Sequence, residues 1–114
     1  MPLFYSMNSH TTYKQVLYTL LLEIPKGRVT TYKSLAICLG SPHLARYVGT
    51  LLGQNEDLSR YPCYRVICSN GSIGGYRLGV EEKRIRLSND GITIHNSTID
   101  LSRYGFSSFS SISL

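Results

Sequence analysis

The chain has 114 residues, a length that allows one small domain and excludes two independent hydrophobic cores. Hydrophobic residues make up 42% and charged residues 17%, which excludes an intrinsically disordered chain. Twelve Lys and Arg against seven Asp and Glu give a net charge of +5, which favours an anionic partner such as nucleic acid but also occurs on ordinary basic surfaces.

Cysteine content and hydropathy bear on location and cofactors. The three cysteines, Cys38, Cys63 and Cys68, cannot all be paired within one chain, which favours a reducing compartment. There is no run of about 18 apolar residues and no secretory N-terminal segment, so we predict an intracellular protein, in cytoplasm or nucleus, without membrane association. The spacing of Cys63, Cys68 and His43 does not match that of zinc ligands, and we predict no metal and no other cofactor.

The first predicted helix begins at a capping box. Thr12 is followed three residues later by Gln15, and the apolar residues up to Ile24 then fall on one helical stripe. Pro25-Lys26-Gly27 ends this helix, and Val29 is predicted to pair briefly as a strand.

Two short helices are predicted next. One begins at a cap on Thr30 or Thr31 and ends at Gly40, which suits the left-handed conformation after a helix. The other begins at Ser41, with proline in the first helical position, and runs to Gly53. Together they form a candidate helix-turn-helix.

A β-hairpin is predicted after these helices. Residues 54–61 are polar and have no period, so we expect a loop there. Residues 64–68 have the pattern of a strand, and Asn70-Gly71 is a strong two-residue hairpin signal that returns the chain towards Tyr76. The predicted fold class is therefore mostly α with a small β-hairpin wing, a winged helix-turn-helix DNA-binding domain.

The last predicted elements are a helix over residues 81–87, ended by Gly91, and a short strand over 92–94. The charged residues of this helix are expected to form a solvated face: Glu81, Glu82, Lys83, Arg84 and Arg86. We predict a domain over residues 1–96 and a serine-rich C-terminal tail over 97–114, which is either loosely ordered or docked.

One motif carries a family resemblance. Pro62-Cys63-Tyr64-Arg65-Val66-Ile67 precedes the glycine-rich Gly71-Ser72-Ile73-Gly74-Gly75-Tyr76. The chain resembles the C-terminal catalytic and DNA-binding domain of alkylguanine-DNA alkyltransferases, in single-domain form. These proteins carry a Pro-Cys-His-Arg-Val motif and take an alkyl group from guanine O6 onto its cysteine. The likeness runs in register from about Tyr13 to Ile92 and includes four separated motifs.

The resemblance implies roles for particular residues. Cys63 is the nucleophile, Asn55 bridges the helix-turn-helix to it, and Asp90 replaces a glutamate as the acid of the proton relay. Arg46 is the arginine finger that fills the gap left by the flipped nucleotide. Tyr32 rotates the DNA, binds the base and protonates the departing guanine. The other implied DNA-contacting residues are Thr31, Ala45, Gly49 and Ser69, and the alkylguanine pocket is formed by Val66, Gly74, Gly75, Tyr76 and Arg77.

Ala45 and Gly49 leave one face of their helix almost without side chains, because they are four residues apart. A glycine inside a helix costs about 1 kcal/mol relative to alanine, so it needs a reason. Two reasons remain open: tight packing against another helix, or close approach to a sugar-phosphate wall. The resemblance favours docking in the minor groove of DNA.

The chemistry requires a cysteine that ionises. A thiolate is a soft nucleophile suited to attack on an alkyl carbon, but a thiol with a pKa of about 8.5 is only a few per cent ionised near pH 7. Free cysteines are also common core residues, and we expect Cys38 and Cys68 to be of that kind.

Tyr64 stands where the family has a histidine. A phenol is a weak base, whereas a positioned base accelerates proton transfer by about 100-fold to 10,000-fold. Either Asp90 acts on Cys63 through water or the protein reacts slowly. Our hypothesis is a working but slower transferase.

The predicted function is DNA repair by a monomer that flips O6-alkylguanine out of double-stranded DNA. The alkyl group passes irreversibly to Cys63, so each molecule acts once. One alternative is a non-enzymatic alkyltransferase-like protein that binds the lesion and recruits another repair pathway. A second is a winged-helix transcriptional regulator, which leaves the motif around Cys63 unexplained.

Overall fold

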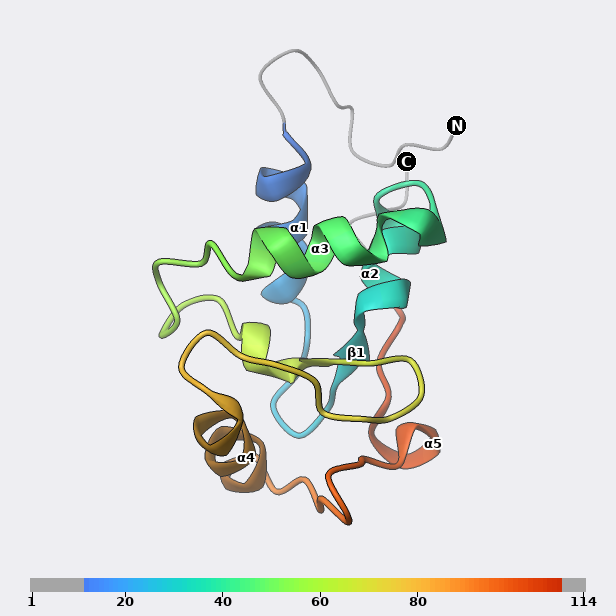
Figure 1. Cartoon of the computed structure of the whole chain (residues 1–114). Coiled ribbons are helices and arrows are strands. Elements are labelled where there is room, and N and C mark those ends of the chain that lie inside the picture. Colours follow the sequence, from blue (N-terminus) through green and yellow to red (C-terminus); the bar gives the residue numbers. More distant parts are fainter. Residues whose placement is uncertain (1–11, 110–114) are drawn as a thin grey trace.

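Helix α1 (Tyr13–Leu21) opens the computed structural model, which describes residues 12–109 (Figure 1). The predicted capping box is confirmed: Thr12 Oγ1 accepts from the Gln15 amide at 3.1 Å, and Gln15 Oε1 accepts from the Thr12 amide at 2.8 Å. The helix ends earlier than predicted, at Leu21 rather than Ile24. Residues 1–11 of the predicted domain and 110–114 of the predicted tail lie outside the described residues.

The helix-turn-helix follows. It comprises the short strand β1 (Thr30–Thr31), helix α2 (Tyr32–Cys38), the 3-10 turn η1 (Pro42–Leu44) and helix α3 (Ala45–Leu52). Thr31 caps α2 by accepting from the Ser34 amide at 3.0 Å, and Gly40 has the predicted positive φ, +123°. The predicted third helix is therefore confirmed, with a 3-10 first turn that Ser41 caps.

The predicted wing is wrong as a hairpin. The turn η2 (Cys63–Arg65) precedes strand β2 (Val66–Ile67), which pairs in parallel with β1 in the register Thr30↔Val66. The turn at Asn70-Gly71 does form, since the Cys68 amide donates to Ser72 O at 2.9 Å.

The returning chain pairs with the C-terminal segment instead of with β2. Ser72 forms an antiparallel bridge with Thr98, and the Ile99 amide donates to Gly71 O at 2.8 Å. A Cβ at Gly71 would lie only 2.9 Å from Ile99 O, so glycine permits this close approach. The local sequence signal correctly predicted the turn. The chain after the turn, however, forms its hydrogen bonds with a segment distant in the sequence.

The C-terminal third contains helix α4 (Val80–Asn89) and the short helix α5 (Leu101–Tyr104). Gly91 follows α4 with φ +88°, as predicted, but residues 92–94 do not form the predicted strand. Residues 97–109 are docked: the Val29 amide donates to Tyr104 O at 2.8 Å, and the Phe106 amide donates to Val29 O at 2.7 Å.

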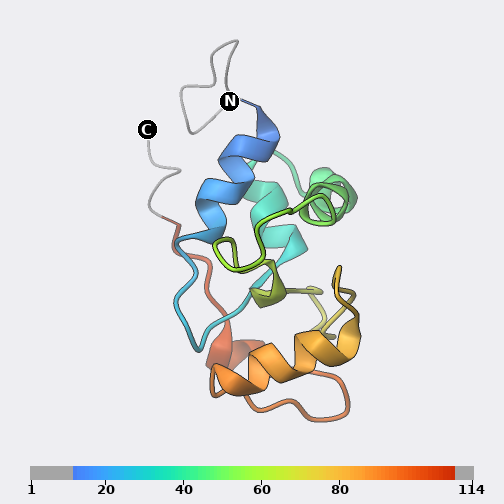
Figure 2. The same cartoon turned by 90° about the vertical axis from the view of Figure 1, so that its left-hand side faces the viewer.

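Two apolar clusters form the core. Helices α1, α2 and α3 enclose the first, which also contains Cys63, Val66 and Phe109. The second contains Val29, Ile67 and Leu87 with residues of the C-terminal segment. Figure 2 shows the corresponding arrangement, with α1–α3 at one end, α4 and α5 at the other, and η2 between them. Within residues 12–109, no helix combines the length and apolar character needed to cross a bilayer.

Candidate functional site

Cys63 begins η2 at the junction of the two ends of the molecule. Its side chain is 6% exposed and belongs to the apolar cluster of α1–α3. Its amide donates to Tyr61 O at 2.8 Å across Pro62, whose φ of −78° and ψ of 64° form an inverse γ-turn. Proline fixes this φ, so the motif restricts the backbone that carries the sulfur.

Asn55 connects α3 to this sulfur. It is fully buried just after the end of α3, and its Nδ2 donates to Tyr61 O at 3.0 Å and to Cys63 Sγ at 3.4 Å. Its Oδ1 accepts from the Asp57 amide at 2.9 Å. Every polar atom of the Asn55 side chain is therefore used to fix the loop around the thiol.

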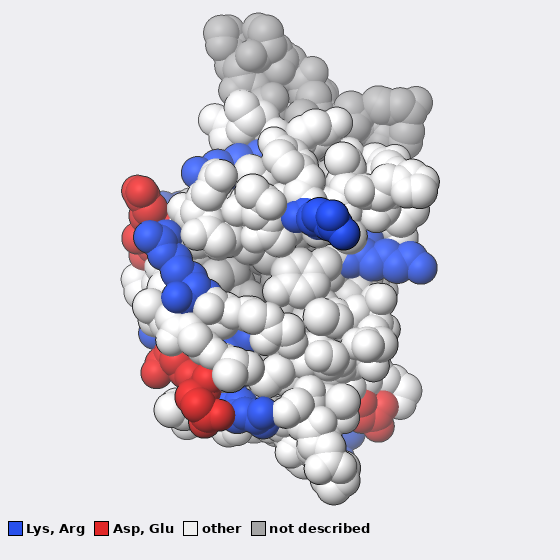
Figure 3. Space-filling view, viewed as in Figure 1, with Lys and Arg blue, Asp and Glu red and all other residues white. Residues whose placement is uncertain are grey.

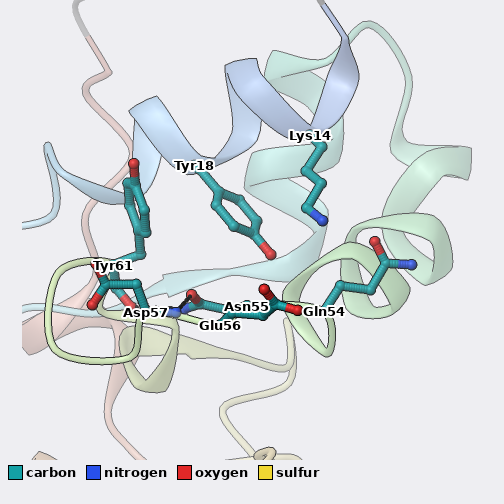
Figure 4. Close-up of a pocket in the computed structure, with 7 residues that line it drawn as sticks. All are labelled: Lys14, Tyr18, Gln54, Asn55, Glu56, Asp57 and Tyr61. Atoms are coloured by element: carbon teal, nitrogen blue, oxygen red, sulfur yellow. Dashed lines mark hydrogen bonds between the residues drawn. The ribbon is translucent and has the colours of Figure 1, made fainter.

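A hollow of about 260 Å³ lies on the α1 side of this loop. In Figure 4, Lys14 and Tyr18 point from α1 towards the loop that carries Asn55. Tyr18 donates to Leu51 O at 2.7 Å. The lining consists of Lys14, Tyr18, Gln54, Asn55, Glu56, Asp57 and Tyr61, so this hollow is separate from the predicted alkylguanine pocket.

Tyr64 and Asp90 form a network of their own. The Tyr64 hydroxyl donates to the Asp90 carboxylate, and Arg65 Nε donates to Asp90 Oδ2 at 2.8 Å. Arg65 also donates to Ile24 O at 3.0 Å, which ties the network to the segment that follows α1. Among the hydrogen bonds of the described residues, none joins Tyr64 or Asp90 to the Cys63 sulfur.

Burial raises the pKa of the Cys63 thiol. The hydrogen bond from Asn55 and the positive charges of Lys83 and Arg86 act in the opposite direction without cancelling it. The thiol is therefore largely protonated near neutral pH, and its ionisation depends on nearby positive charge.

Lys83 is the residue that the sequence reasoning misplaced. Lys83 was predicted to face solvent, but it is fully buried. Its Nζ donates to Val66 O at 2.7 Å and to Gly75 O at 2.9 Å. Burial lowers the pKa of Lys83 to about 8. One signal pointed this way: Lys83 precedes the buried Leu87 by one helical turn, so the two share a face of α4.

Tyr32 lies between two glycines at the edge of the site. A Cβ at Gly74 would lie 3.5 Å from the Tyr32 hydroxyl, and a Cβ at Gly49 would lie 3.9 Å from the Tyr32 ring. Gly74 has φ +72°, a conformation that favours glycine. Burial raises the pKa of Tyr32 to about 12, so its phenol stays protonated and able to donate.

The glycine-rich bend supplies the remaining predicted pocket residues. Val66 is buried, Gly75 is exposed, and the Tyr76 hydroxyl is buried without a hydrogen-bond partner among the described residues. Arg77 donates to Asn55 O and so links the bend to the loop around Cys63. A buried hydroxyl left unpaired is rare in folded proteins.

The outer face of α3 carries the predicted DNA-contacting residues. Arg46 is exposed, and Ala45 and Gly49 are half-buried. In Figure 3, Lys and Arg side chains lie over and beside α3, while Asp and Glu lie at the edges of this face. The structure does not bring all the predicted contacts to the surface: Thr31 is buried as the cap of α2, whereas Ser69 is exposed in the turn after β2.

Within residues 12–109, no three His, Cys, Asp or Glu side chains are grouped so that they could hold a metal ion. Of the other cysteines, Cys38 is buried on α2, and Cys68 is partly buried beside Gly74.

Comparisons with known proteins identify the family of the chain. Residues 12–92 match the model of the 6-O-methylguanine DNA methyltransferase, DNA binding domain. A bifunctional methyltransferase/endonuclease of Picrophilus torridus is 55% identical over 83% of this chain, which spans only 32% of that protein's length.

Solved structures agree with the sequence match. The structure of S. pombe Atl1 in complex with damaged DNA containing O6-carboxymethylguanine superimposes with a TM-score of 0.74 at 28% identity, covering 82% of this chain and 94% of the other. The Mycobacterium tuberculosis OGT in complex with DNA gives 0.67 at 36% identity, covering 71% and 49%. The chain therefore belongs to the 6-O-methylguanine DNA methyltransferase family, through its DNA-binding domain.

Proposed function

We propose that this protein repairs DNA by transferring the alkyl group of O6-alkylguanine to Cys63. The observation that carries the proposal is the hydrogen bond of 3.4 Å from Asn55 to the Cys63 sulfur, because it couples the thiol to the end of α3. A structural cysteine in an apolar core needs no such donor.

The reaction is a displacement at the alkyl carbon. The Cys63 thiolate attacks that carbon, a carbon–sulfur bond forms, and the bond from carbon to guanine O6 breaks with its electron pair remaining on the guanine. Tyr32, whose raised pKa keeps its phenol protonated, supplies a proton to the departing guanine and regains one from solvent water. The thioether is a poor leaving group, so each molecule acts once.

The substrate is double-stranded DNA, held by a monomer through the minor groove against α3. Two explanations for Gly49 were open, and its surroundings favour DNA: an added Cβ would meet only the Tyr32 ring, at an ordinary contact distance of 3.9 Å. Packing within the protein therefore does not require the glycine. Arg46 is exposed on the same helix and is free to fill the space of a flipped nucleotide.

The transfer is slow, because no base is positioned at the sulfur. The Tyr64 hydroxyl donates a hydrogen bond to Asp90, and burial together with that hydrogen bond raises the pKa of Tyr64, so its phenol stays protonated. Positioned bases contribute about 100-fold to 10,000-fold, so the rate falls short of that of a relative with histidine at this position.

Mass spectrometry after incubation with an oligonucleotide containing O6-methylguanine tests the proposal. Trypsin places each cysteine in its own peptide: Cys38 in 34–46, Cys63 in 61–65 and Cys68 in 66–77. We expect one methyl group on peptide 61–65 and none on the other two, and no methylation in a Cys63→Ser control.

Two other outcomes identify the alternatives. Tight binding to the lesion without a change of mass indicates an alkyltransferase-like lesion binder, the class for which S. pombe Atl1 is the structural comparison. Preference for one undamaged operator sequence indicates a transcriptional regulator.

A further inference from the structure

Lys83 is a buried cation without a carboxylate partner. The ion pairs of the described residues join Arg65, Arg84 and Arg86 to acidic side chains and do not include Lys83. Burying an unpaired ammonium group is costly, and such groups are kept where their charge has a use.

The contacts of Lys83 place its charge between the segment that follows Cys63 and the glycine-rich bend. Nζ donates to Val66 O, which follows the turn that begins at Cys63, and to Gly75 O in the glycine-rich bend. An ammonium group has three hydrogens, so these two bonds leave one N–H for a further acceptor. The Tyr32 ring covers Nζ, with its centroid 5.9 Å away, and thus helps to exclude water.

The other groups that act on Cys63 do not supply a base. The titratable and charged groups that face it are Tyr18 from α1, Tyr32 from α2, Tyr76 from the bend, and Lys83 and Arg86 from α4; Cys68 faces Lys83. The tyrosines are neutral at pH 7. The Arg86 charge is shared with Glu82, at 2.9 Å, so Lys83 is the cation whose charge is not already balanced.

We propose that the ammonium group of Lys83 stabilises the thiolate of Cys63 and takes over the activation that a histidine at position 64 supplies in the family. The inference rests on the proposed function, and it names Lys83 as the group that makes alkyl transfer possible without a base. The thiol proton passes to solvent water, Lys83 keeps its own proton, and the sulfur reacts as the anion. Lys83 is thus a positioning residue that acts through Cys63.

The dependence of Cys63 alkylation on pH tests this role without DNA. Wild-type chain, Lys83→Met, Lys83→Arg and Lys26→Met are treated with iodoacetamide from about pH 5 to about pH 10, and peptide 61–65 is quantified. Lys26 is exposed between α1 and β1 and serves as the control for loss of a positive charge.

We expect Lys83→Met to lower the alkylation rate about tenfold at pH 7, where Lys83 is charged, and to match the wild type well above pH 8, where Lys83 is neutral. Lys83→Arg keeps the charge and restores most of the rate, and Lys26→Met matches the wild type. A folded Lys83→Met variant with an unchanged rate at pH 7 overturns the proposal, because Lys83 then only holds the two carbonyl groups.

A second measurement uses only the wild type, so it applies even where Lys83→Met does not fold. The alkylation rate of Cys63 is followed through the pH at which Lys83 loses its charge, about 8. We expect the rise of the rate with pH to flatten near pH 8, because the positive charge that favours the thiolate is lost there. A rise of constant slope through this pH overturns the proposal.

Methyl transfer measured on the same variants separates this inference from the proposed function. Slower alkylation of Lys83→Met at pH 7, without methyl transfer by the wild type, rejects the repair function and keeps the thiolate–ammonium pair. Methyl transfer at equal rates by wild type and Lys83→Met rejects the pair and keeps the repair function.

Discussion

The Tyr64 hydroxyl donates to both carboxylate oxygens of Asp90, at 3.1 and 3.0 Å. Arg65 donates to the same carboxylate at 2.8 Å, so Asp90 is already neutralised by a cation. This side-chain network lies next to Cys63 in the sequence, but its hydrogen bonds are donated to Asp90, and none of those found among the described residues reaches the sulfur.

Substitutions of Tyr64 test whether its hydroxyl has a catalytic role. Tyr64→Phe should change the methyl-transfer rate by less than about tenfold, because the lost hydrogen bond ends on Asp90. Tyr64→His should accelerate transfer by supplying a base, as measured by single-turnover kinetics with O6-methylguanine DNA. An unchanged or slower Tyr64→His protein contradicts the account of Tyr64 as the cause of slow transfer.

Gly49→Ala should raise the stability of the fold and lower its affinity for DNA. Alanine in α3 stabilises the fold by about 1 kcal/mol, since its Cβ has room 3.9 Å from Tyr32, but the same Cβ obstructs the approach of DNA. Urea unfolding and fluorescence anisotropy measure the two effects. Ser88→Ala on the exposed surface of α4 is the matched control, which should gain stability without losing affinity. A Gly49→Ala protein that binds DNA as tightly as the wild type removes the reason given for this glycine.

Tyr76→Phe should stabilise the free protein while weakening lesion binding. Its hydroxyl is buried and unpaired, so removing it recovers about 1 kcal/mol. Tyr18→Phe is the contrast, because it loses a hydrogen bond to Leu51 O at 2.7 Å and should be destabilised. Thermal unfolding and competition between lesion-containing and undamaged DNA measure both properties. A destabilised Tyr76→Phe protein would show that the hydroxyl has a partner in solution.

Truncation after residue 96 should destabilise or unfold the domain, although the family match ends at residue 92. It removes buried Ile99 and Tyr104 and the two hydrogen bonds to Val29. Loss of buried side chains of this size costs about 2–5 kcal/mol each. Circular dichroism and urea unfolding of the 1–96 chain provide the measurement, with the 1–109 chain as the control. Wild-type stability of the shorter chain would make residues 97–109 dispensable.

Lys83 should make stability depend on pH in a defined window. Burial lowers its pKa from the usual 10.5 to about 8, so between these values the unfolded chain binds more protons than the folded one. The contribution of Lys83 to stability therefore rises with pH from about 8 to 10.5. The difference in free energy of unfolding between wild type and Lys83→Met isolates this contribution, because the titrations of Tyr32 and Cys38 cancel. A difference that is constant across the window contradicts the burial of a charged Lys83.

Local signals in the sequence predicted the helices and the turns. The capping box of Thr12 and Gln15, the glycine at position 40 and the Asn70-Gly71 turn each act within a few residues, so the same bonds form wherever the rest of the chain lies. The resemblance around Cys63 likewise indicated which residues to inspect, and Asn55 lies beside the sulfur.

Contacts between distant segments determined the rest. Strand β2 pairs with β1 because Val29–Thr31 and Val66–Ile67 meet in the core. The chain after the Asn70-Gly71 turn forms its hydrogen bonds with residues 97–99. The sequence predicted helix α4 but not which of its faces is buried. Lys83 faces the carbonyl groups of Val66 and Gly75 because other elements pack against its face of the helix. The sequence by itself determined the helices and the turns, because these depend on neighbouring residues. The tertiary structure alone decided which charges surround Cys63, because burial is set by chain segments far apart in the sequence.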